Sequence, residues 1–279
     1  SRDETIALWD ISDPGSPVRL STPQGGHTDK IYTMIASPDG RQLISAGADQ
    51  QIVFWDVSNA GRPSRLPRTF DDHSAEVNAL AISGDGQILA SGDDSGIIIL
   101  WDLVTGQRLG TLLGHSNWIL ELDFDSTGRY LASASRDGTI LLWDVAARTR
   151  LSGPFALHQN WVWDVEFSAD DRQLVSAGRD NRVILWDVET NPSLGLALNN
   201  LELPILGLSF PTRDTVALLA GNNAATWPID LPEEQILGIE AARLALTDAQ
   251  EGSLILSADG EWAAAYSGRV VYLWDTVEG

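Results

Sequence analysis

Residues 97–102 read Ile-Ile-Ile-Leu-Trp-Asp, an apolar run that ends in the pair Trp-Asp, and this pattern recurs along the chain. The tryptophans that close such runs lie 41 to 47 residues apart, and they are Trp9, Trp55, Trp101, Trp143, Trp186, Trp227 and Trp274. An aspartate follows each of them except Trp227, which is followed by Pro228. Short apolar runs rich in β-branched residues are typical of strands buried on both faces. The 279-residue chain is therefore predicted to consist of repeated β-strand units.

Two further motifs recur in register with the Trp-Asp pairs. They are the pairs Gly26-His27 and Gly114-His115, which open repeats, and the hairpin turn Ser37-Pro38-Asp39-Gly40, which is echoed at residues 83–86 and 257–260. Through these motifs the sequence resembles the WD40-repeat family over nearly the whole chain. The resemblance implies an all-β fold, a β-propeller of four-stranded antiparallel blades with about seven blade positions.

The repeat spacing places one propeller domain over residues 1–279. A partial blade of residues 1–26 precedes six repeats, which span residues 27–56, 57–102, 103–144, 145–187, 188–230 and 231–279. The partial blade supplies two strands and the last repeat lacks its outer strand, so that we expect 25 strands in all. Because this falls short of seven complete blades, we expect the chain to be a segment of a longer protein, with any targeting signal or effector domain outside it.

The last third of the chain departs from the pattern. Residues 188–279 carry 13 acidic and 3 basic residues, and Asn199 and Ala217 stand where earlier repeats have histidine and serine. The stretch 232–246 begins with a proline and acidic residues, which favours a helix start, whereas the repeat spacing requires an outer strand. We expect a strand near residues 237–244, after a longer loop near residues 228–236.

The resemblance also implies one buried hydrogen-bonded network in each complete blade. The residues concerned are His27, Ser45, Asp49 and Trp55; His73, Ser91 and Trp101; His115, Ser133, Asp137 and Trp143; and His158, Ser176, Asp180 and Trp186. Each histidine precedes its serine by 18 residues and its tryptophan by 28, while Ser95 stands where the second repeat lacks the aspartate. Imidazole and hydroxyl groups both donate and accept, and a buried indole N–H needs an acceptor, which makes such a network physically reasonable.

A serine, a histidine and an aspartate in one neighbourhood also describe a hydrolase triad. An enzyme needs one such set beside a cleft, whereas here the set recurs at fixed spacing and uses all four histidines of the chain. We therefore expect these residues to be structural, with no catalytic residue and no enzymatic activity. The sequence has no phosphate-binding loop, dinucleotide fingerprint or zinc-binding helix motif, so that no cofactor and no metal site are expected.

The charge balance excludes further classes of partner. The chain has 18 Lys and Arg against 39 Asp and Glu, a net charge of −21. Binders of nucleic acid or of anionic membranes neutralise phosphates with basic side chains, and neither kind of partner is expected here. The chain has no cysteine, which excludes disulfides and cysteine-based zinc sites. Arg62, Arg65 and Arg68 form a small basic cluster among prolines, which we expect on a solvated outer strand.

Binding is expected at residues that the repeat does not require. The candidates are aromatic residues three or five positions after a histidine and arginines directly before a network aspartate, namely Tyr32, Trp118, Trp161, Trp163, Arg136 and Arg179. By resemblance to the family, both kinds of position face the top of the propeller channel. Aromatic residues together with arginine are typical of interface hot spots, so that these residues are predicted to form the binding site.

The predicted function is that of a non-catalytic protein–protein interaction or sensing scaffold, which binds a protein or peptide on the top face of the propeller. The resemblance to bacterial members suggests a cytoplasmic signalling role, in which the propeller regulates a neighbouring domain. The alternative is a hydrolase or lactonase with its active site in the propeller channel. Such enzymes usually need inward-facing carboxylates or histidines that hold a metal, and the lack of a spare histidine disfavours this alternative.

Overall fold

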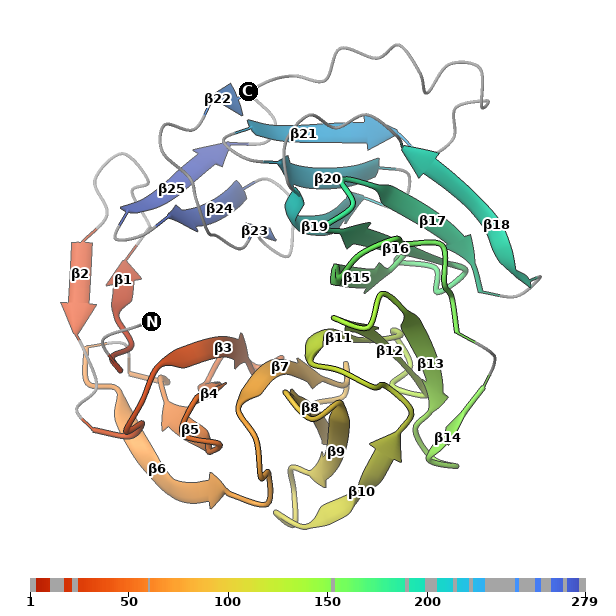
Figure 1. Cartoon of the computed structure of the whole chain (residues 1–279). Helices are drawn as coiled ribbons and strands as arrows, with labels where there is room; N and C mark the ends of the chain where they lie inside the picture. Colours follow the sequence, from red (N-terminus) through yellow and green to blue (C-terminus); the bar gives the residue numbers. More distant parts are fainter. Residues whose placement is uncertain are drawn as a thin grey trace. The chain divides into compact units, whose positions relative to one another are not determined.

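The structure is a computed structural model, and it describes residues 4–10, 18–21, 25–59, 61–151 and 154–188. Beyond residue 188 it describes the backbone of strands at residues 191–198, 205–212, 215–220, 223–228, 244–245, 254–256, 262–267 and 270–275. All the regular secondary structure within these residues consists of β-strands. The described strands number 25, in one two-stranded, five four-stranded and one three-stranded antiparallel sheet (Figure 1). The predicted all-β fold with four-stranded propeller blades is thus confirmed.

The sheets follow one another along the chain, and each four-stranded sheet is a meander. The two-stranded sheet contains β1 (Leu8–Asp10) and β2 (Val18–Ser21). The first four-stranded sheet contains β3 (Ile31–Ala36), β4 (Gln42–Gly47), β5 (Ile52–Asp56) and β6 (Ser64–Phe70). The second contains β7 (Val77–Ile82), β8 (Ile88–Asp93), β9 (Ile97–Asp102) and β10 (Arg108–Leu113). The third contains β11 (Ile119–Phe124), β12 (Tyr130–Ser135), β13 (Ile140–Asp144) and β14 (Thr149–Arg150).

The later sheets repeat this order. The fourth sheet contains β15 (Val162–Phe167), β16 (Gln173–Gly178), β17 (Val183–Asp187) and β18 (Asn191–Leu198). The fifth contains β19 (Ile205–Thr212), β20 (Thr215–Ala220), β21 (Asn223–Pro228) and β22 (Leu244–Ala245). The three-stranded sheet contains β23 (Leu254–Leu256), β24 (Trp262–Ser267) and β25 (Val270–Asp275).

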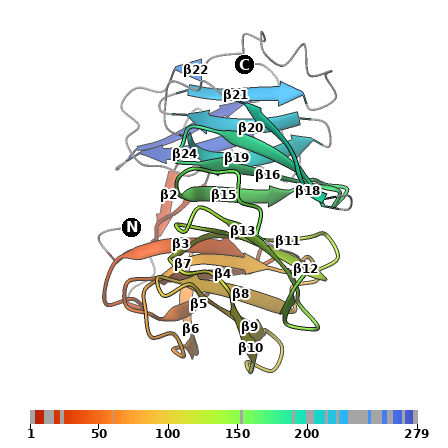
Figure 2. The same ribbon diagram turned by 45° about the vertical axis from the view of Figure 1, so that its right-hand side comes forward.

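The chain divides into two compact units. The N-terminal unit contains residues 1–133 and 141–152, and the C-terminal unit contains residues 134–140 and 153–279. Within the N-terminal unit the first strands β3, β7 and β11 are neighbours, and within the C-terminal unit β15, β19 and β23 are neighbours (Figure 1, Figure 2). In each unit the fourth strands lie on the opposite edge of their sheets, which is the arrangement of propeller blades.

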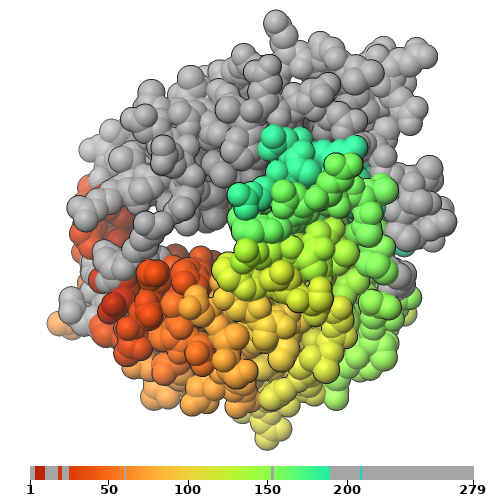
Figure 3. All heavy atoms as spheres, in the orientation of Figure 1, coloured from red at the N-terminus to blue at the C-terminus, as the bar shows by residue number. Residues whose placement is uncertain are grey.

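The apolar runs that end in Trp-Asp form the third strands, which are buried on both faces. In β5, β9 and β13 the tryptophan and the three residues before it are all buried. Trp101 also stacks on Phe70 of the preceding sheet, with ring centroids 4.3 Å apart. In the space-filling view the sheets of the N-terminal unit pack closely against one another (Figure 3). Burial of these runs explains why the sequence shows continuous apolar segments rather than alternation.

The hairpin turn Ser37-Pro38-Asp39-Gly40 joins β3 to β4, where the sequence predicted a turn. The Gly40 N–H donates to the Ser37 carbonyl at 2.8 Å, and Asp39 accepts the Ser37 hydroxyl at 2.6 Å. Gly40 has a φ of +66°, a left-handed conformation that glycine adopts without a steric cost. Three other expectations, Asn199, the hairpin at residues 257–260 and the loop over residues 229–236, lie outside the described residues. So does most of the strand expected near residues 237–244, of which the structure describes β22.

The basic cluster on the first sheet corrects one expectation. Arg62 and Arg65 are exposed as predicted, but Arg68 in β6 is partly buried. Its guanidinium lies 4.5 Å from the ring centroid of Phe54 and 4.8 Å from that of Phe70. Arg68 therefore packs over two rings of its own sheet and donates to the Leu103 carbonyl of the neighbouring sheet, instead of forming a solvated edge.

Candidate functional site

A hydrogen-bonded network links the third strand of the first sheet to the loop before its first strand. The Trp55 indole N–H donates to Ser45 Oγ at 2.8 Å, and Ser45 Oγ lies 2.7 Å from Nε2 of His27. Both oxygens of the Asp49 carboxylate lie 3.0 Å from His27 Nδ1. Ser45 is fully buried and His27 is 6% exposed, so that these groups depend on one another for hydrogen bonds.

The carboxylate decides where the protons of this network lie. An ionised carboxylate only accepts, so that His27 Nδ1 carries the proton and Nε2 is left as an acceptor. The Ser45 hydroxyl then donates to Nε2, while its oxygen accepts the Trp55 N–H. Every polar group of the set has a partner, and the hydrogen bonds run in one direction from the indole to the carboxylate.

The same geometry recurs in the next three sheets. The indole N–H groups of Trp101, Trp143 and Trp186 donate at 2.8 Å to Ser91, Ser133 and Ser176, respectively. The serine oxygens lie 2.7 to 2.8 Å from the Nε2 atoms of His73, His115 and His158. In the fourth sheet Asp180 lies 3.0 Å from His158 Nδ1, and in the third sheet the side chain of Asp137 accepts the Thr139 hydroxyl at 2.6 Å.

The second sheet takes its carboxylate from a position that the sequence analysis missed. Asp93 lies 2.8 Å from His73 Nδ1, whereas the spacing pointed to Ser95. Ser95 instead donates its hydroxyl to the other Asp93 oxygen at 2.6 Å. The fourth sheet has Gly178 at the place of Asp93, and a Cβ there would clash with the imidazole and with the Asp180 carboxylate. The first and fourth sheets thus bring a carboxylate to the imidazole from the turn after the second strand, and the second sheet brings it from the end of that strand. An acid two residues before the expected one is the signal in the sequence.

Burial and hydrogen bonding act in opposite directions on these charges. Burial raises the pKa of Asp93, but the hydrogen bonds that it accepts, first from His73, outweigh burial and bring the pKa below its ordinary value. Burial lowers the pKa of His158, and the Asp180 carboxylate restores it only in part. The His158 imidazole is therefore neutral at pH 7, as an accepting Nε2 requires.

A β-bulge marks the start of the first strand in the first, second and fourth sheets. The strand register shifts between Ile31 and Thr33, between Val77 and Ala79, and between Val162 and Asp164. The extra residue in each case is the one five positions after the histidine, namely Tyr32, Asn78 or Trp163. Bulges re-aim side chains and are common beside functional sites, so that this position is suited to present a side chain outside the core.

Four of the predicted binding residues lie together in the C-terminal unit. The Arg136 guanidinium lies 3.9 Å from the ring centroid of Trp161, and that of Arg179 lies 4.4 Å from it. The Trp163 ring meets Trp161 edge-on at 5.2 Å. Arg136 lies between β12 and β13, Arg179 between β16 and β17, and both tryptophans at the entry to β15. We call these four residues the aromatic–arginine cluster.

Hydrogen bonds from the backbone N–H groups of two of its members fix the cluster, and its side chains remain partly exposed. The Arg179 N–H donates to the Trp161 carbonyl at 2.7 Å, and the Trp161 N–H donates to Asn160 Oδ1 at 2.9 Å. Both tryptophans are partly buried, and Arg179 is exposed. Cation–π contacts with arginine stabilise such stacks, so that the indole and the guanidinium planes are held in place before any partner binds.

The other two predicted residues lie in the N-terminal unit. Tyr32 is 41% exposed and donates its hydroxyl to Glu76 at 2.7 Å. Burial, the hydrogen bond to Glu76 and the nearby carboxylates of Asp29 and Asp94 raise the pKa of Tyr32 to about 12. Trp118 is 36% exposed, and its N–H donates to its neighbour's side chain as in Trp161. Tyr32 thus lies in an acidic environment, in contrast to the cluster.

A partly buried carboxyl that the sequence analysis missed connects the fourth sheet to the fifth. Asp164 in β15 accepts the Leu208 N–H of β19 at 2.6 Å. Burial raises the pKa of Asp164 to about 6, although the N–H groups of Leu208 and Val165 act against this. The signal in the sequence is an acidic residue within the apolar run of a first strand.

The repeat geometry is that of a known family. The family described as "WD domain, G-beta repeat" matches residues 18–56, 64–102, 106–144 and 150–187, which is more than half of the chain. The chain belongs to the WD40-repeat family. Each WD40 match begins at or near the outer strand of one sheet and ends with the Trp-Asp pair of the next. A comparison with curated protein sequences gives no significant match.

WD40 repeats generally mediate protein–protein interaction or scaffolding, and WD40 propellers are typically non-catalytic. Among the described residues of this WD40 chain, no three His, Asp or Glu side chains are grouped so that they could hold a metal ion. That same part of the chain also contains no helix long and apolar enough to cross a membrane.

Proposed function

We propose that this WD40 chain is a non-catalytic interaction platform that holds an acidic peptide segment of a partner protein at the aromatic–arginine cluster. The observation that carries the proposal is that the guanidiniums of Arg136 and Arg179 both lie over the Trp161 ring, 3.9 and 4.4 Å from its centroid. Because guanidinium groups pair with carboxylates in a planar, bidentate manner, such a stack offers both charge and apolar area to one peptide.

The charge of the chain supports an acidic segment as the ligand. With a net charge of −21, most of the surface repels acidic peptides, and binding is favoured where two arginines are concentrated. Stacking on Trp161 restricts the guanidinium groups in advance, so that less side-chain entropy is lost on binding. Tyr32 and Trp118 supply exposed aromatic area in the N-terminal unit, which is a separate surface suited to partner contacts.

The histidine networks support a non-catalytic role. All four histidines of the chain are 5–8% exposed and hydrogen-bonded to buried serines. None is in position to act as a general base on a bound substrate. We include in the proposal that the partner is a protein rather than nucleic acid or a membrane, and that binding regulates a neighbouring signalling domain in the cytoplasm.

Selection of random peptides against the immobilised protein tests the proposal. We expect selected peptides to be enriched in Asp and Glu and to lose binding to the double variant Trp161→Ala/Arg179→Ala. The matched control is Trp9→Ala/Arg150→Ala, which removes an exposed tryptophan and an exposed arginine from other strands. Peptides that bind the double variant as tightly as the parent, or that show no acidic enrichment, would contradict the proposal.

A further inference from the structure

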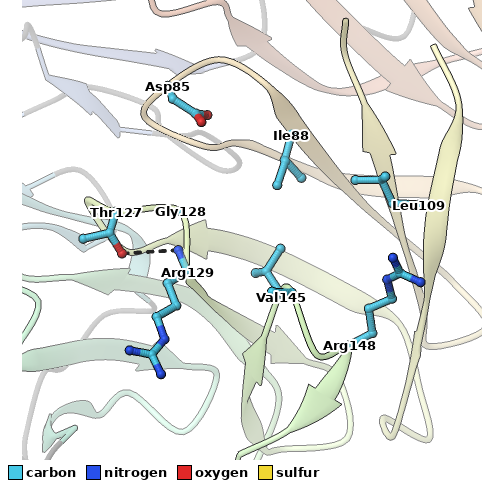
Figure 4. A pocket seen from close by; sticks show the side chains of 9 residues that line it. Asp85, Ile88, Leu109, Thr127, Gly128, Arg129, Val145 and Arg148 are labelled. Carbon is cyan, nitrogen blue, oxygen red and sulfur yellow. Dashed lines mark hydrogen bonds between the residues drawn. The ribbon is translucent and has the colours of Figure 1, made fainter. Parts of the chain in front are cut away.

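A groove of about 350 Å³ lies between the second and third sheets of the N-terminal unit (Figure 4). It lies at the end of the sheets where turns join β7 to β8 and β11 to β12. This is the end at which the first strands β7 and β11 finish, not the end at which they begin. Ile88, Leu109 and Val145 line its apolar part, and Asp85, Arg129 and Arg148 surround it. The repeat networks and the aromatic–arginine cluster do not include any of these residues.

The groove lies at the second junction, between the second and third sheets. At the first junction, between the first and second sheets, Arg68 fills the corresponding place. Thr69 pairs with Val53 in the first sheet and Thr111 pairs with Ile99 in the second, and both partners lie two residues before the repeat tryptophan. Gly110 is therefore the equivalent of Arg68. Where the first sheet places a long side chain, the second sheet places none.

The arginine of the second junction comes instead from the turn of the following sheet. Arg148 lies five residues after the repeat tryptophan, at the place of Gly106, and both N–H groups donate at 2.8 Å to the carbonyl of the Trp-Asp aspartate. A Cβ at Gly110 would lie 2.7 Å from Arg148 Cδ, so that the glycine leaves room for the arginine. Glycine and arginine have thus exchanged places between the two junctions.

The backbone at Arg148 is unfavourable for arginine. Its φ is +57°, in the left-handed region, where Gly106 has +75°. The other non-glycine residues in that region are Glu4, Gln50, Asp171 and Asn181 among the described residues. Asp and Asn tolerate the region, whereas a long unbranched side chain such as that of Arg148 gains no local hydrogen bond there. Strained positions of this kind concentrate at binding sites, where the surrounding structure maintains them.

The two junctions differ in how their arginines are used. The Arg68 guanidinium donates to the Leu103 carbonyl at 2.7 Å and is enclosed by two phenylalanine rings. Arg129 and Arg148 are both exposed, and among the described residues neither forms an ion pair. Asp85, the acid at the groove, already accepts the Ser83 hydroxyl at 2.6 Å and a backbone N–H within its own turn.

We propose that this groove is a second binding site, which takes an aliphatic side chain followed by a carboxylate side chain from an extended segment of a partner protein. The aliphatic group packs on Ile88, Leu109 and Val145, where it is removed from water. The carboxylate pairs with the Arg148 guanidinium, which lies near Leu109, whereas Arg129 points away from the apolar residues (Figure 4) and lies over the Tyr130 ring. The strained Arg148 is retained because it supplies this charge at the wall of the groove.

Nuclear magnetic resonance titration with two short peptides tests the site. The probes are acetyl-Gly-Leu-Glu-Gly-amide and its neutral counterpart acetyl-Gly-Leu-Gln-Gly-amide, each at millimolar concentration. We expect the Glu peptide to shift the amide signals of Gly110, Gly128 and Arg148, and to bind at least about tenfold more tightly than the Gln peptide.

Two variants connect the result to the groove. Gly110→Arg/Arg148→Gly copies the first junction, so that an internal arginine fills the groove, and it should abolish the shifts. Arg148→Gly alone removes the strained residue and should weaken the Glu peptide about tenfold without lowering the unfolding temperature. Arg150→Gln, an exposed charge change in β14, is the matched control and should bind as the parent does.

Three results would overturn the proposal. They are equal shifts from the Glu and Gln peptides, undiminished binding by Gly110→Arg/Arg148→Gly, and shifts at these amides from inorganic phosphate alone but not from the Glu peptide. The last result would assign Arg148 to a simple anion rather than to a peptide.

Discussion

The second sheet (β7–β10) and the fifth sheet (β19–β22) have the same strand order, but only one of them has a histidine and a serine at the network positions. In the second sheet Trp101 and His73 both bond to Ser91, which is fully buried. In the fifth sheet Ala217 stands at the place of the serine, within the paired strand β20. Strand pairing in a blade therefore does not require the network.

The difference shows what the network contributes. Where it is present, each polar group is buried and relies on its partners, so that removal of one leaves the others unpaired at a high cost. The fifth sheet keeps the repeat tryptophan, Trp227, but lacks the histidine and the serine. In the sheets that have the complete set, the contribution of each member therefore depends on the others.

The largest effect is expected from breaking a network at its centre. Ser133→Ala removes the acceptor of the Trp143 N–H and the partner of His115 Nε2, both in the buried core. We expect the free energy of unfolding to fall by about 2–3 kcal/mol. Chemical denaturation measures this change. An unchanged denaturation midpoint would show that the hydroxyl is not needed by its partners.

A somewhat smaller effect separates Asp93 from Ser95. Asp93→Ala leaves His73 Nδ1 without its carboxylate and should lower the free energy of unfolding by about 2 kcal/mol. Ser95→Ala removes one hydrogen bond to Asp93 and should cost less than about 1 kcal/mol. A larger loss for Ser95→Ala than for Asp93→Ala in denaturation experiments would contradict this assignment and would favour position 95, which the repeat spacing indicates.

The boundary between the two kinds of sheet is predicted to be sensitive to pH. Burial raises the pKa of Asp164 to about 6, above its unfolded value, so that its contribution to stability is present at low pH and is lost as the pH rises through about 6. The lowered pKa of His158 acts in the opposite sense, because its contribution is lost as the pH falls below the ordinary histidine value.

Asp164→Asn isolates this contribution, since the amide oxygen still accepts the Leu208 N–H. The free energy of unfolding of the variant minus that of the parent should rise by about 1 kcal/mol as the pH is raised from 5 to 7.5. Parallel denaturation curves at the two pH values measure the gain. Equal pH dependence of parent and variant would place the titration elsewhere.

The smallest effect is expected where the fifth sheet is given one member of the set. Ala217→Ser restores the hydroxyl, but the chain has no histidine in this region to accept it. We expect no stabilisation, with a change within about 0.5 kcal/mol of zero or a loss. A clear rise in the unfolding temperature would show that single members of the network act independently.

The sheets could be predicted because the same sequence pattern recurs several times along the chain. A buried run before Trp-Asp becomes the third strand whenever neighbouring sheets cover both of its faces, and the spacing from His73 to Ser91 is kept in every network. Sequence spacing could not predict Asp93, because a side chain at the strand end and one in the turn reach the same imidazole.

The members of the aromatic–arginine cluster could be predicted as residue types but not as contacts. The spacing indicated Trp161 and Arg179, yet the stacking of a second guanidinium from Arg136 depends on how adjacent sheets are staggered. Arg68 was wrongly expected in solvent for the same reason, since its rings come from its own sheet and its carbonyl partner from the next. Contacts between sheets leave no period in the sequence.

The central claim is that repeated positions hold the fold while the aromatic–arginine cluster binds. Titration of one selected acidic peptide into the parent, Ser133→Ala and Trp161→Ala/Arg179→Ala tests it, at a temperature where all three are folded. The account predicts that Ser133→Ala binds as the parent does despite its lower stability, and that the double variant keeps its unfolding temperature but loses at least about tenfold in affinity. Equal affinity of the double variant and the parent, or a loss of binding in Ser133→Ala alone, would contradict the account.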